Sequence, residues 1–355
     1  MEYLQIKRNG KIWILSKKDL TLSLCLFHPN NTKGKLFKLC VIIFHKFHCL
    51  TFLPGIRIID FQLDESISSK IKEIYNYQEL TFSIYSNIEG ITPKQTIQIV
   101  NERTILGYCQ LGNSRELLSN FYHEVDFLNF LQDKGINNLP IPQFAGIVDN
   151  KALFCQSTIM TSKSRFSKVW NEKHIEFLKQ LYISTAKKIP FEQTDFYNLL
   201  LKYKSISSQN ISKENYHILE SGINFIFNTN KNKIVQFGAC HWDFTPWNMF
   251  VEKDELFVLD WEYAQYTFPP FIDFFHFFTQ NCILSKGITD SKKIYSLYLK
   301  EKHRISCLIP NPDISFRYYL VAIIIFYFIE HKGFSDKDKS CQCWLNLLEI
   351  LNHKK

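Results

Sequence analysis

Three polar side chains that can bind a metal ion or accept a proton lie close together in the second half of the chain. Asp243 and Asn248 stand in the segment HWDFTPWN, residues 241–248, and Asp260 follows twelve positions later in LDWEYA. No helical or strand periodicity links them, but a loop followed by a two-stranded ribbon would bring all three to one edge. Two carboxylates and a carboxamide oxygen are hard ligands of the kind that Mg²⁺ prefers.

The spacing of these residues is what phosphoryl transfer requires. A metal ion neutralises the charge of the phosphates, while a separate carboxylate accepts or orients the proton of the acceptor hydroxyl. The kinase-type loop has the form H-x-D-x-x-x-x-N, with an aspartate on a following strand as a further metal ligand. The chain meets this spacing with four residues: His241, Asp243, Asn248 and Asp260. Each of them alone is more often structural, so the prediction depends on the set.

These segments resemble those of the aminoglycoside phosphotransferase and choline kinase group, a phosphotransferase family with a protein-kinase-like fold. HWDFTPWNMF is similar to the family's HGDFxPxN loop, with Trp242 where glycine is usual, and LFVLDWEYA is similar to its DWE or DFE segment. PPFIDFFHFF resembles the helix start that follows, whose aspartate, here Asp273, braces the catalytic loop. The similarity extends over about residues 80–330 and is specific only in 241–276.

The resemblance implies a role for each matching residue. Asp243 would act as the catalytic base or as a carboxylate that positions the hydroxyl, and His241 would brace the loop. Asn248 and Asp260 would hold Mg²⁺, with ATP as the phosphoryl donor. Glu262 would be an acid behind these ligands or, equally well, a surface or bracing residue.

Four further residues are expected to contact the nucleotide. In this fold a lysine on the third strand contacts the α/β-phosphates and pairs with a glutamate on the next helix. Glu124 stands where that glutamate should be, but the lysine position in GYCQLG is occupied by Gln110. Lys94, at the start of the second strand, is a candidate replacement, or else a solvated residue at a strand end. Gly90 is the one glycine of SNIEGI and makes a poor phosphate loop.

The elements that must position these residues are predicted from periodicity. Alternation predicts three adjacent strands, TFSIYS, KQTIQIV and TILGYCQLG, within residues 81–112. A helix over residues 115–134 and a hairpin of FAGIVDN and KALFCQSTIM follow. After about residue 160 the pattern becomes helical, interrupted by KIVQFGAC, a strand or a helix end, and by two short strands, NMFVEK and ELFVLD.

The predicted fold class is α+β, a protein-kinase-like two-lobe fold with a small antiparallel β N-lobe, a larger and mainly helical C-lobe and an N-terminal extension. The predicted domains are a basic extension at residues 1–75, a β-rich nucleotide-binding lobe at 76–158 and a helical catalytic lobe at 159–355. The longest apolar run, Tyr318 to Ile329, is too short to span a bilayer and predicts a buried helix.

The composition bears on location and partners. The ten cysteines are dispersed without a CxxC pair, and the first 20 residues are charged, which favours a reduced, cytoplasmic protein.

Residues 1–50 carry nine Lys or Arg against two Asp or Glu, beside the apolar stretch Leu36 to Leu53. Residues 1–53 are therefore a candidate peripheral contact with an anionic membrane at its inner face, or a solvated and partly packed extension. No aromatic and basic stripe accompanies this charge, so nucleic acid is not an expected partner.

Two functions are compatible with these observations. The first is an ATP- and Mg²⁺-dependent kinase of a hydroxyl on a small molecule, such as a sugar or a surface-glycan intermediate. The second is a pseudokinase, a nucleotide-binding scaffold, and Gln110 is its main support. The retained set of Asp243, Asn248 and Asp260 favours the kinase, because enzymes replace a phosphate contact more readily than a base or a metal ligand. The basic, apolar N-terminus suggests an anionic or membrane-linked acceptor.

Overall fold

A computed structural model describes most of the chain: residues 2–8, 10–29, 32–87, 94–113, 115–204, 211–331, 333 and 338–353. The chain divides into two compact units, and each is described by itself. Unit 1 consists of Met1–Asp133, Asn137–Phe166 and Phe250–Glu262. Unit 2 consists of Lys134–Ile136, Ser167–Met249 and Tyr263–Lys355.

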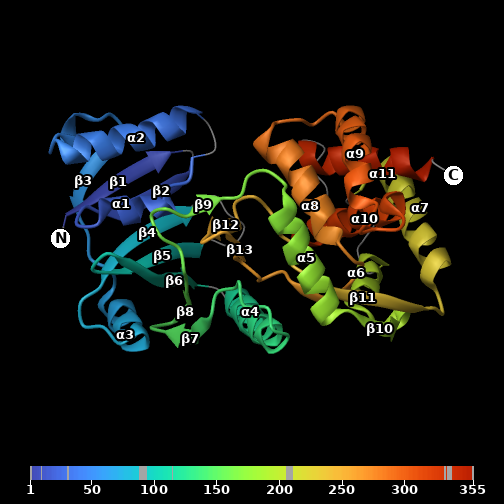
Figure 1. Cartoon of the computed structure of the whole chain (residues 1–355), viewed down its shortest axis with the longest axis horizontal. Helices are drawn as coiled ribbons and strands as arrows, with labels where there is room; N and C mark the ends of the chain where they lie inside the picture. Colours follow the sequence, from blue (N-terminus) through green and yellow to red (C-terminus); the bar gives the residue numbers. More distant parts are fainter. Residues whose placement is uncertain are drawn as a thin grey trace. The chain divides into compact units, whose positions relative to one another are not determined.

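Unit 1 is built on an antiparallel sheet of eight strands in the order β3-β1-β2-β4-β5-β6-β8-β7 (Figure 1). Its strands are β1 (Glu2–Arg8), β2 (Lys11–Ser16), β3 (Ile56–Asp60), β4 (Thr81–Asn87), β5 (Lys94–Asn101), β6 (Thr104–Gly112), β7 (Pro142–Val148) and β8 (Lys151–Ser157). The three strands predicted from alternation are confirmed as β4, β5 and β6, and the predicted hairpin is β7 and β8.

The first 60 residues extend this sheet at one edge. β1 pairs with β2 and β3, and β2 pairs with β4. Alternate residues of β1, Leu4 and Ile6, are fully buried, and they share a core with Trp13, Leu15 and the helix residue Val41. The predicted extension at residues 1–75 therefore contributes three strands to the sheet of the lobe that was predicted to begin at residue 76.

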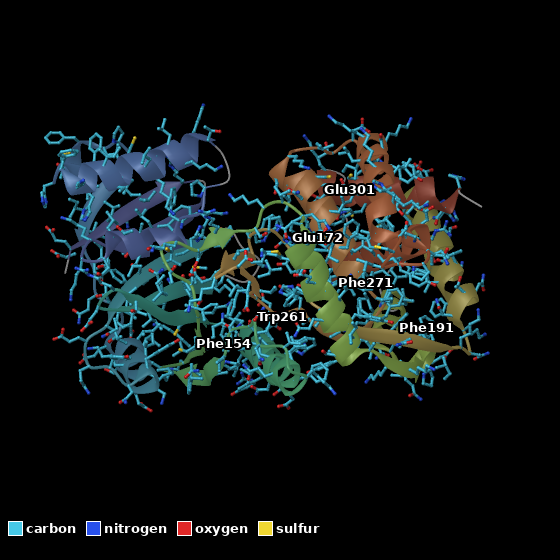
Figure 2. All side chains as sticks on the ribbon, in the orientation of Figure 1. Phe154, Glu172, Phe191, Trp261, Phe271 and Glu301 are labelled. Carbon is cyan, nitrogen blue, oxygen red and sulfur yellow. The ribbon has the colours of Figure 1, made fainter. Side chains whose placement is uncertain are left out.

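Four helices accompany the sheet of unit 1: α1 (Leu20–Ser23), α2 (Thr32–Lys46), α3 (Glu65–Tyr75) and α4 (Arg115–Asp133). Helix α4, predicted at residues 115–134, packs through aromatic pairs, Phe121 with Phe154 of β8 and Phe127 with Trp261, at ring-centroid distances of 5.5 and 5.7 Å. Phe154 and Trp261 are labelled in Figure 2. This packing fixes the helix that carries Glu124 next to the segment that carries Asp260.

A small ribbon follows the loop at residues 241–248. It has the order β13-β12-β9, with β9 (Arg165–Phe166), β12 (Met249–Glu252) and β13 (Glu255–Val258). Lys253 and Asp254 form the turn between β12 and β13, with left-handed φ values of 48° and 69°. The ribbon that the sequence predicts in NMFVEK and ELFVLD is confirmed, and Asp260 lies two residues beyond its end.

Unit 2 is mainly helical around a small antiparallel sheet in the order β10-β11-β14. Its helices are α5 (Glu172–Thr185), α6 (Asp195–Lys204), α7 (Lys213–Asn230), α8 (Ile272–Gln280), α9 (Ser291–Ile305), α10 (Pro312–Glu330) and α11 (Lys339–Asn352). Its strands are β10 (Lys187–Pro190), β11 (Ile234–Cys240), which is the segment KIVQFGAC, and β14 (Gln265–Phe268). Short 3₁₀ or π segments complete both units: η1 (Leu24–Leu26), η2 (Leu50–Phe52), η3 (Phe191–Gln193) and η5 (Asn281–Ser285).

Helix α10 is the centre of unit 2. Within the described residues it is the one helix whose length and composition would allow it to cross a membrane, and 67% of that apolar window is buried inside the fold. Its Phe316 stacks on Phe275 of α8 at 5.1 Å, and Gly222 of α7 allows the approach of Val321, which an added Cβ would meet at 2.7 Å. The buried core helix predicted from the run Tyr318 to Ile329 is confirmed.

Candidate active site

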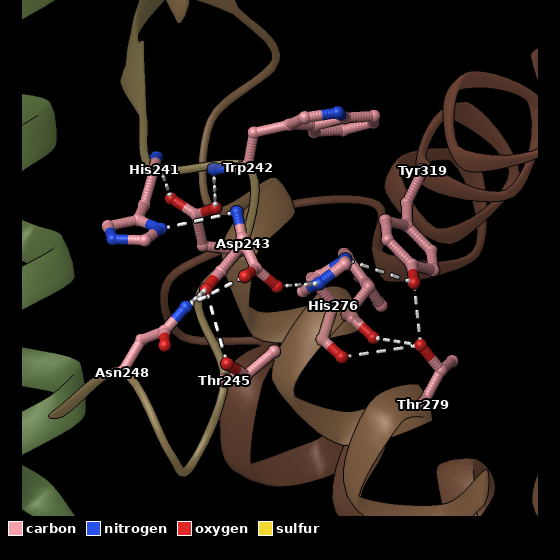
Figure 3. Close-up of polar contacts among 10 residues, drawn as sticks. His241, Trp242, Asp243, Thr245, Asn248, His276, Thr279 and Tyr319 are labelled. Atoms are coloured by element: carbon pink, nitrogen blue, oxygen red, sulfur yellow. Dashed lines mark hydrogen bonds and ion pairs between the residues drawn. The ribbon is translucent and has the colours of Figure 1, made fainter. Parts of the chain in front are cut away.

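The loop at residues 241–248 is tied to the start of α8 by one carboxylate. Asp273, in the first turn of α8, accepts the backbone N–H of His241 at 2.8 Å and of Trp242 at 2.9 Å (Figure 3). Asp273 is buried, and burial raises its pKa, although the nearby His241 and the two backbone N–H groups act in the opposite direction. The bracing contact that the resemblance implies for Asp273 is present.

Trp242 adopts a backbone conformation that usually requires glycine. Its φ is 68°, in the left-handed region, and a non-glycine residue held there stores roughly 1 to 3 kcal/mol of strain. The indole is buried and packs edge-on against Phe268 and Phe326, with ring centroids 5.1 and 5.8 Å away. Burial of the indole offsets this strain, and the loop forms its contact with Asp273 with tryptophan at this position.

Both carboxylate oxygens of Asp243 are held by side chains of unit 2. Asn248 Nδ2 donates to Oδ2 at 2.7 Å and also to the Asp243 carbonyl oxygen at 3.1 Å. His276 Nε2 lies 3.2 Å from Oδ1. The Asp243 side chain nevertheless remains 32% exposed, so it is oriented by the protein and still accessible from solvent.

The other two loop residues contribute through their hydrogen bonds. His241 is fully buried, and its Nδ1 accepts the backbone N–H of Asp243 at 3.2 Å, which is a bracing contact. Asn248 uses its amide nitrogen for Asp243, which leaves Oδ1 as the atom that can ligate a metal ion. The structure thus brings together three residues that the sequence predicts for the site: His241, Asp243 and Asn248.

Unit 1 contains a second group of charged residues, which we call the charged cluster: Lys94, Glu124, Asp260 and Glu262. Lys94 Nζ lies 2.8 Å from Glu262 Oε1 and 3.7 Å from Asp260 Oδ1. Glu124 is fully buried and accepts the backbone N–H of Trp261 at 3.1 Å through Oε1. Two carboxylates therefore flank one ammonium group, and Glu124 is held beside them through Trp261.

The charges of the cluster shift each other's ionisation. Burial disfavours the charged form of Lys94, but the negative charges of Asp260 and Glu262 outweigh burial and raise its pKa. Burial, followed by the same two negative charges, raises the pKa of Glu124 well above its usual range. Glu124 Oε2 and Asp260 Oδ1 are buried atoms without a hydrogen-bond partner. The excess of negative charge fits an additional cation.

Gln110, at the predicted lysine position, points to the same face of the sheet as Lys94. Gln110 of β6 is opposite Thr96 of β5, and Lys94 precedes Thr96 by two residues on the same strand. Side chains alternate between the faces with a period of two, so Lys94 and Gln110 are diagonal neighbours. Gln110 is buried and its Oε1 has no hydrogen-bond partner. A lysine is thus supplied to this face from the neighbouring strand.

Gly90, a predicted nucleotide contact, lies outside the described residues. Of the two predicted metal ligands, Asn248 belongs to unit 2 and Asp260 to unit 1. Among the described residues no group of three or more His, Cys, Asp or Glu side chains forms a metal-binding set by itself. The donor chemistry of the Asp260 and Asn248 oxygens nevertheless suits Mg²⁺.

Sequence reasoning missed His276, which contacts Asp243. A signal was available, because His276 follows Asp273 by three residues in IDFFHFF, and residues three apart lie on the same face of a helix. The helix that presents Asp273 to the loop therefore also presents His276 to it.

Comparison with known proteins supports the fold. No protein family matches the sequence, and no curated protein matches it. Among solved structures, a thermostable mutant of aminoglycoside phosphotransferase APH(4)-Ia matches with a TM-score of 0.54 at 9% identity, over 80% of this chain and 97% of that chain. Choline kinase LicA from Streptococcus pneumoniae matches with a TM-score of 0.54 at 16% identity, over 80% of this chain and 98% of that chain.

At such identities the likeness concerns the fold. It covers nearly the whole of both solved chains. The predicted α+β class, an antiparallel β lobe and a mainly helical lobe, is confirmed. The chain therefore has the kinase-like fold that it shares with an aminoglycoside phosphotransferase and a choline kinase.

Proposed function

We propose that the protein is an ATP- and Mg²⁺-dependent phosphotransferase that phosphorylates a hydroxyl group of a small molecule. The observation that carries the proposal is the Asp243 carboxylate, whose oxygens are held by Asn248 at 2.7 Å and His276 at 3.2 Å while the side chain stays 32% exposed. A carboxylate that is oriented and still reachable is what a general base needs. The solved proteins of similar fold, which include a choline kinase, support the same reaction class.

In the proposed reaction the acceptor oxygen attacks the γ-phosphorus of ATP. The bond between this phosphorus and the bridging oxygen of the leaving ADP breaks, and Asp243 takes the hydroxyl proton. Asn248 and Asp260 are the proposed ligands of Mg²⁺, which when bound neutralises phosphate charge. Their support is chemical: Asn248 Oδ1 is not used by Asp243, and Asp260 Oδ1 lacks a hydrogen bond.

We assign the phosphate contact to Lys94 in place of the missing strand lysine. Lys94 is on the same sheet face as Gln110, and the negative charges of Asp260 and Glu262 keep it protonated. Glu124 then occupies the position of the helix glutamate, where its Oε1 accepts the backbone N–H of Trp261 at 3.1 Å. Solved structures of similar fold include LicA in complex with AMP and an APH(4)-Ia mutant with ADP and hygromycin B. These complexes support a nucleotide as the ligand.

The alternative is a pseudokinase that binds a nucleotide without transferring phosphate. Gln110 favours it, since a neutral amide cannot supply a point charge to the phosphates. Lys94 counters it, because a lysine that already lies 2.8 Å from Glu262 and 3.7 Å from Asp260 supplies that charge from β5. We therefore retain catalysis as the proposed function.

The experiment that tests the proposal is an acceptor screen that measures ADP release from ATP with Mg²⁺ present. The panel contains choline, ethanolamine, aminoglycosides, free sugars and lipid-linked sugars, and the product is identified by a mass increase of one phosphoryl group. The wild type is compared with Asp243→Asn and with Asp133→Asn, an exposed control. We expect acceptor-dependent ADP release that only Asp243→Asn abolishes. Nucleotide binding without release for any acceptor would support the pseudokinase.

For the acceptor we propose a sugar or surface-glycan intermediate presented at an anionic membrane. The specific observation is the outward side of α2 and the residue after it, where four apolar side chains are exposed at helical spacing: Leu36 61%, Leu39 51%, Ile43 43% and Phe47 71%. A surface helix normally turns polar residues to solvent. The core-facing side of α2 is formed by other residues, Val41, Phe37 and Phe44. The four exposed apolar side chains therefore form a second apolar face of the helix.

The charge around this apolar face is complementary to an anionic bilayer. Lys33, Lys35 and Lys46 are exposed on the same helix, and each lysine near such a surface contributes about 1 kcal/mol to binding. We accordingly propose a cytoplasmic protein that contacts the inner face of the membrane through residues 1–53. The ten dispersed cysteines, none of them in a CxxC pair, agree with a reducing compartment.

Point substitutions test the membrane contact, because deletion of the region would remove β1 and β2 from the sheet. Vesicles of phosphatidylcholine with and without phosphatidylglycerol are sedimented with the wild type and with Leu36→Ser/Ile43→Ser/Phe47→Ser. The control, Val169→Ser/Ile183→Ser, alters apolar residues that are 72% and 77% exposed elsewhere. We expect anionic vesicles to bind the wild type and the control, and the triple variant to bind at least tenfold more weakly. Equal binding of all three, or a dimer that only the triple variant loses, would contradict the proposal.

A further inference from the structure

A series of buried polar side chains connects Asp243 with the interior of unit 2. His276 Nε2 lies 3.2 Å from Asp243 Oδ1, and Tyr319 Oη lies 3.4 Å from His276 Nδ1 (Figure 3). Thr279 Oγ1 holds the Tyr319 hydroxyl from its other side at 2.6 Å. The His276 side chain is only 4% exposed, and Tyr319 and Thr279 are fully buried.

His276 is a buried polar residue among the phenylalanines of helix α8. It stands in IDFFHFF, and it is surrounded by aromatic rings, with Trp242 at a ring-centroid distance of 6.3 Å and Tyr319 at 5.9 Å. Burial of an imidazole in such a place is unfavourable unless its nitrogens are hydrogen-bonded. A phenylalanine would fill the position without this requirement, so packing alone does not account for histidine.

The partners of His276 define which nitrogen carries hydrogen. An ionised carboxylate only accepts hydrogen bonds, so the nitrogen that faces Asp243, Nε2, must carry a hydrogen. On the other side of the ring, the Tyr319 hydroxyl lies 3.4 Å from Nδ1 and is held by Thr279 Oγ1 at 2.6 Å. Tyr319 and Thr279 thus support the ring orientation in which Nε2 faces Asp243.

We infer that His276 is a positioning residue for Asp243. It holds one carboxylate oxygen from α8, while Asn248 holds the other from within the loop, so the side chain cannot rotate away from the acceptor hydroxyl. This inference rests on the proposed function, in which Asp243 is the base. A displacement of about 1 Å at a reacting group is enough to lower a rate by about 100-fold.

A kinetic experiment separates positioning from packing. His276→Phe keeps a ring but removes the donor, His276→Gln keeps a donor near the position of Nε2, and Tyr319→Phe removes only the supporting hydroxyl. We expect His276→Phe to lower kcat about 10- to 100-fold with an unchanged KM for ATP, and His276→Gln to recover most of the loss. Tyr319→Phe should lower kcat a few-fold, and His217→Gln, an exposed control, should have no effect. Equal losses in His276→Phe and His276→Gln, together with lower melting temperatures, would mean that the residue only packs.

A spectroscopic experiment tests the contact without requiring turnover. With ¹⁵N-labelled histidine, the wild type should show His276 as the Nε2–H tautomer with a slowly exchanging proton, assigned from its absence in His276→Gln. Asp243→Ala should make that proton exchange rapidly. A spectrum that Asp243→Ala leaves unchanged would overturn the inference, whatever the kinetics. If the contact is present but no acceptor is phosphorylated, the proposed function fails and the Asp243–His276 contact stands as a property of the fold.

Discussion

The loop at residues 241–248 and the charged cluster differ in how completely the protein satisfies their polar groups. In the loop, both oxygens of Asp243 and both oxygens of Asp273 have hydrogen-bond partners. In the charged cluster, Glu124 Oε2 and Asp260 Oδ1 have no hydrogen-bond partner, and the carboxylates of Asp260 and Glu262 share one ammonium group.

In the proposed function this difference corresponds to two different roles. The loop is fixed by protein contacts alone, which the proposed base would require before the substrate arrives. The charged cluster keeps buried oxygens without partners, each of which destabilises the fold by about 1 to 3 kcal/mol. Such an arrangement is retained where a ligand supplies what is missing, and here the missing element is positive charge. The predictions below separate these two descriptions.

The largest expected effect is on catalysis at the loop. Asp243→Asn keeps the shape of the side chain but removes the base, so we expect kcat to fall about 1,000-fold or more, with ATP affinity unchanged. The measurement is steady-state ADP release with the acceptor that the screen identifies, alongside calorimetric ATP binding. A tenfold loss of ATP affinity in this variant would assign Asp243 to the nucleotide site instead.

The next effect concerns the lysine of the charged cluster. Lys94→Met should weaken ATP binding about 10- to 100-fold, because a charge-assisted hydrogen bond to phosphate contributes about 1.5 to 3 kcal/mol. The swapped variant Lys94→Met/Gln110→Lys returns the charge to the same sheet face from β6, so binding should recover to within about tenfold of the wild type. Melting temperatures identify any variant that loses binding through unfolding. Unchanged binding in Lys94→Met would remove this residue from the site.

A histidine beside the loop should make the protein sensitive to acid. His174 is buried at the start of α5, its ring lies 6.2 Å from that of Phe244, and burial lowers its pKa to about 4. The unfolded chain binds this proton near pH 6.5, so the free energy of unfolding should fall by up to about 3 kcal/mol as pH drops from 6.5 to 4. His174→Gln preserves the capping box with Asn171 and should flatten this slope in urea titrations. An equally steep slope in His174→Gln would contradict this assignment.

The smallest effect should appear at the charged cluster, in the opposite pH direction. The folded pKa of Glu124 is raised, so its ionisation in the unfolded chain lowers the free energy of unfolding as pH rises past about 4.5. Glu124→Gln should therefore unfold with a free energy about 1 to 2 kcal/mol higher at pH 8 and the same at pH 4. Glu116→Gln, on the exposed side of α4, is the control. A loss of stability at pH 8 in Glu124→Gln would show that the carboxylate is satisfied after all.

The same two regions differ in how far the sequence could predict them. The loop residues are close in sequence and follow a motif, so Asp243, Asn248 and the bracing Asp273 could be identified from spacing. His276 could not be recognised as easily, because it is embedded in a run of phenylalanines and meets Asp243 only when α8 packs against the loop. The pairing of Lys94 with Glu262 joins residues 168 positions apart and depends on strand register.

The strands were predictable where alternation was undisturbed. β4, β5 and β6 are seven to nine residues long and rich in apolar residues with polar residues between them, and the sequence predicts all three. The strands at residues 2–16 were missed, because their charged and polar residues read as a basic extension while Leu4, Ile6 and Leu15 were already suited to a core. Their place at the sheet edge depends on pairing with β4, which no local pattern specifies.

The most direct test of the account is calorimetric ATP binding with and without Mg²⁺, in the wild type and in Asp260→Asn. The charged cluster holds an excess of negative charge and an Asp260 oxygen that has no hydrogen bond and lies 3.7 Å from Lys94 Nζ. We predict that Mg²⁺ strengthens ATP binding to the wild type at least tenfold and that Asp260→Asn removes this gain without lowering the melting temperature. ATP binding that is independent of Mg²⁺ in both proteins would contradict the account.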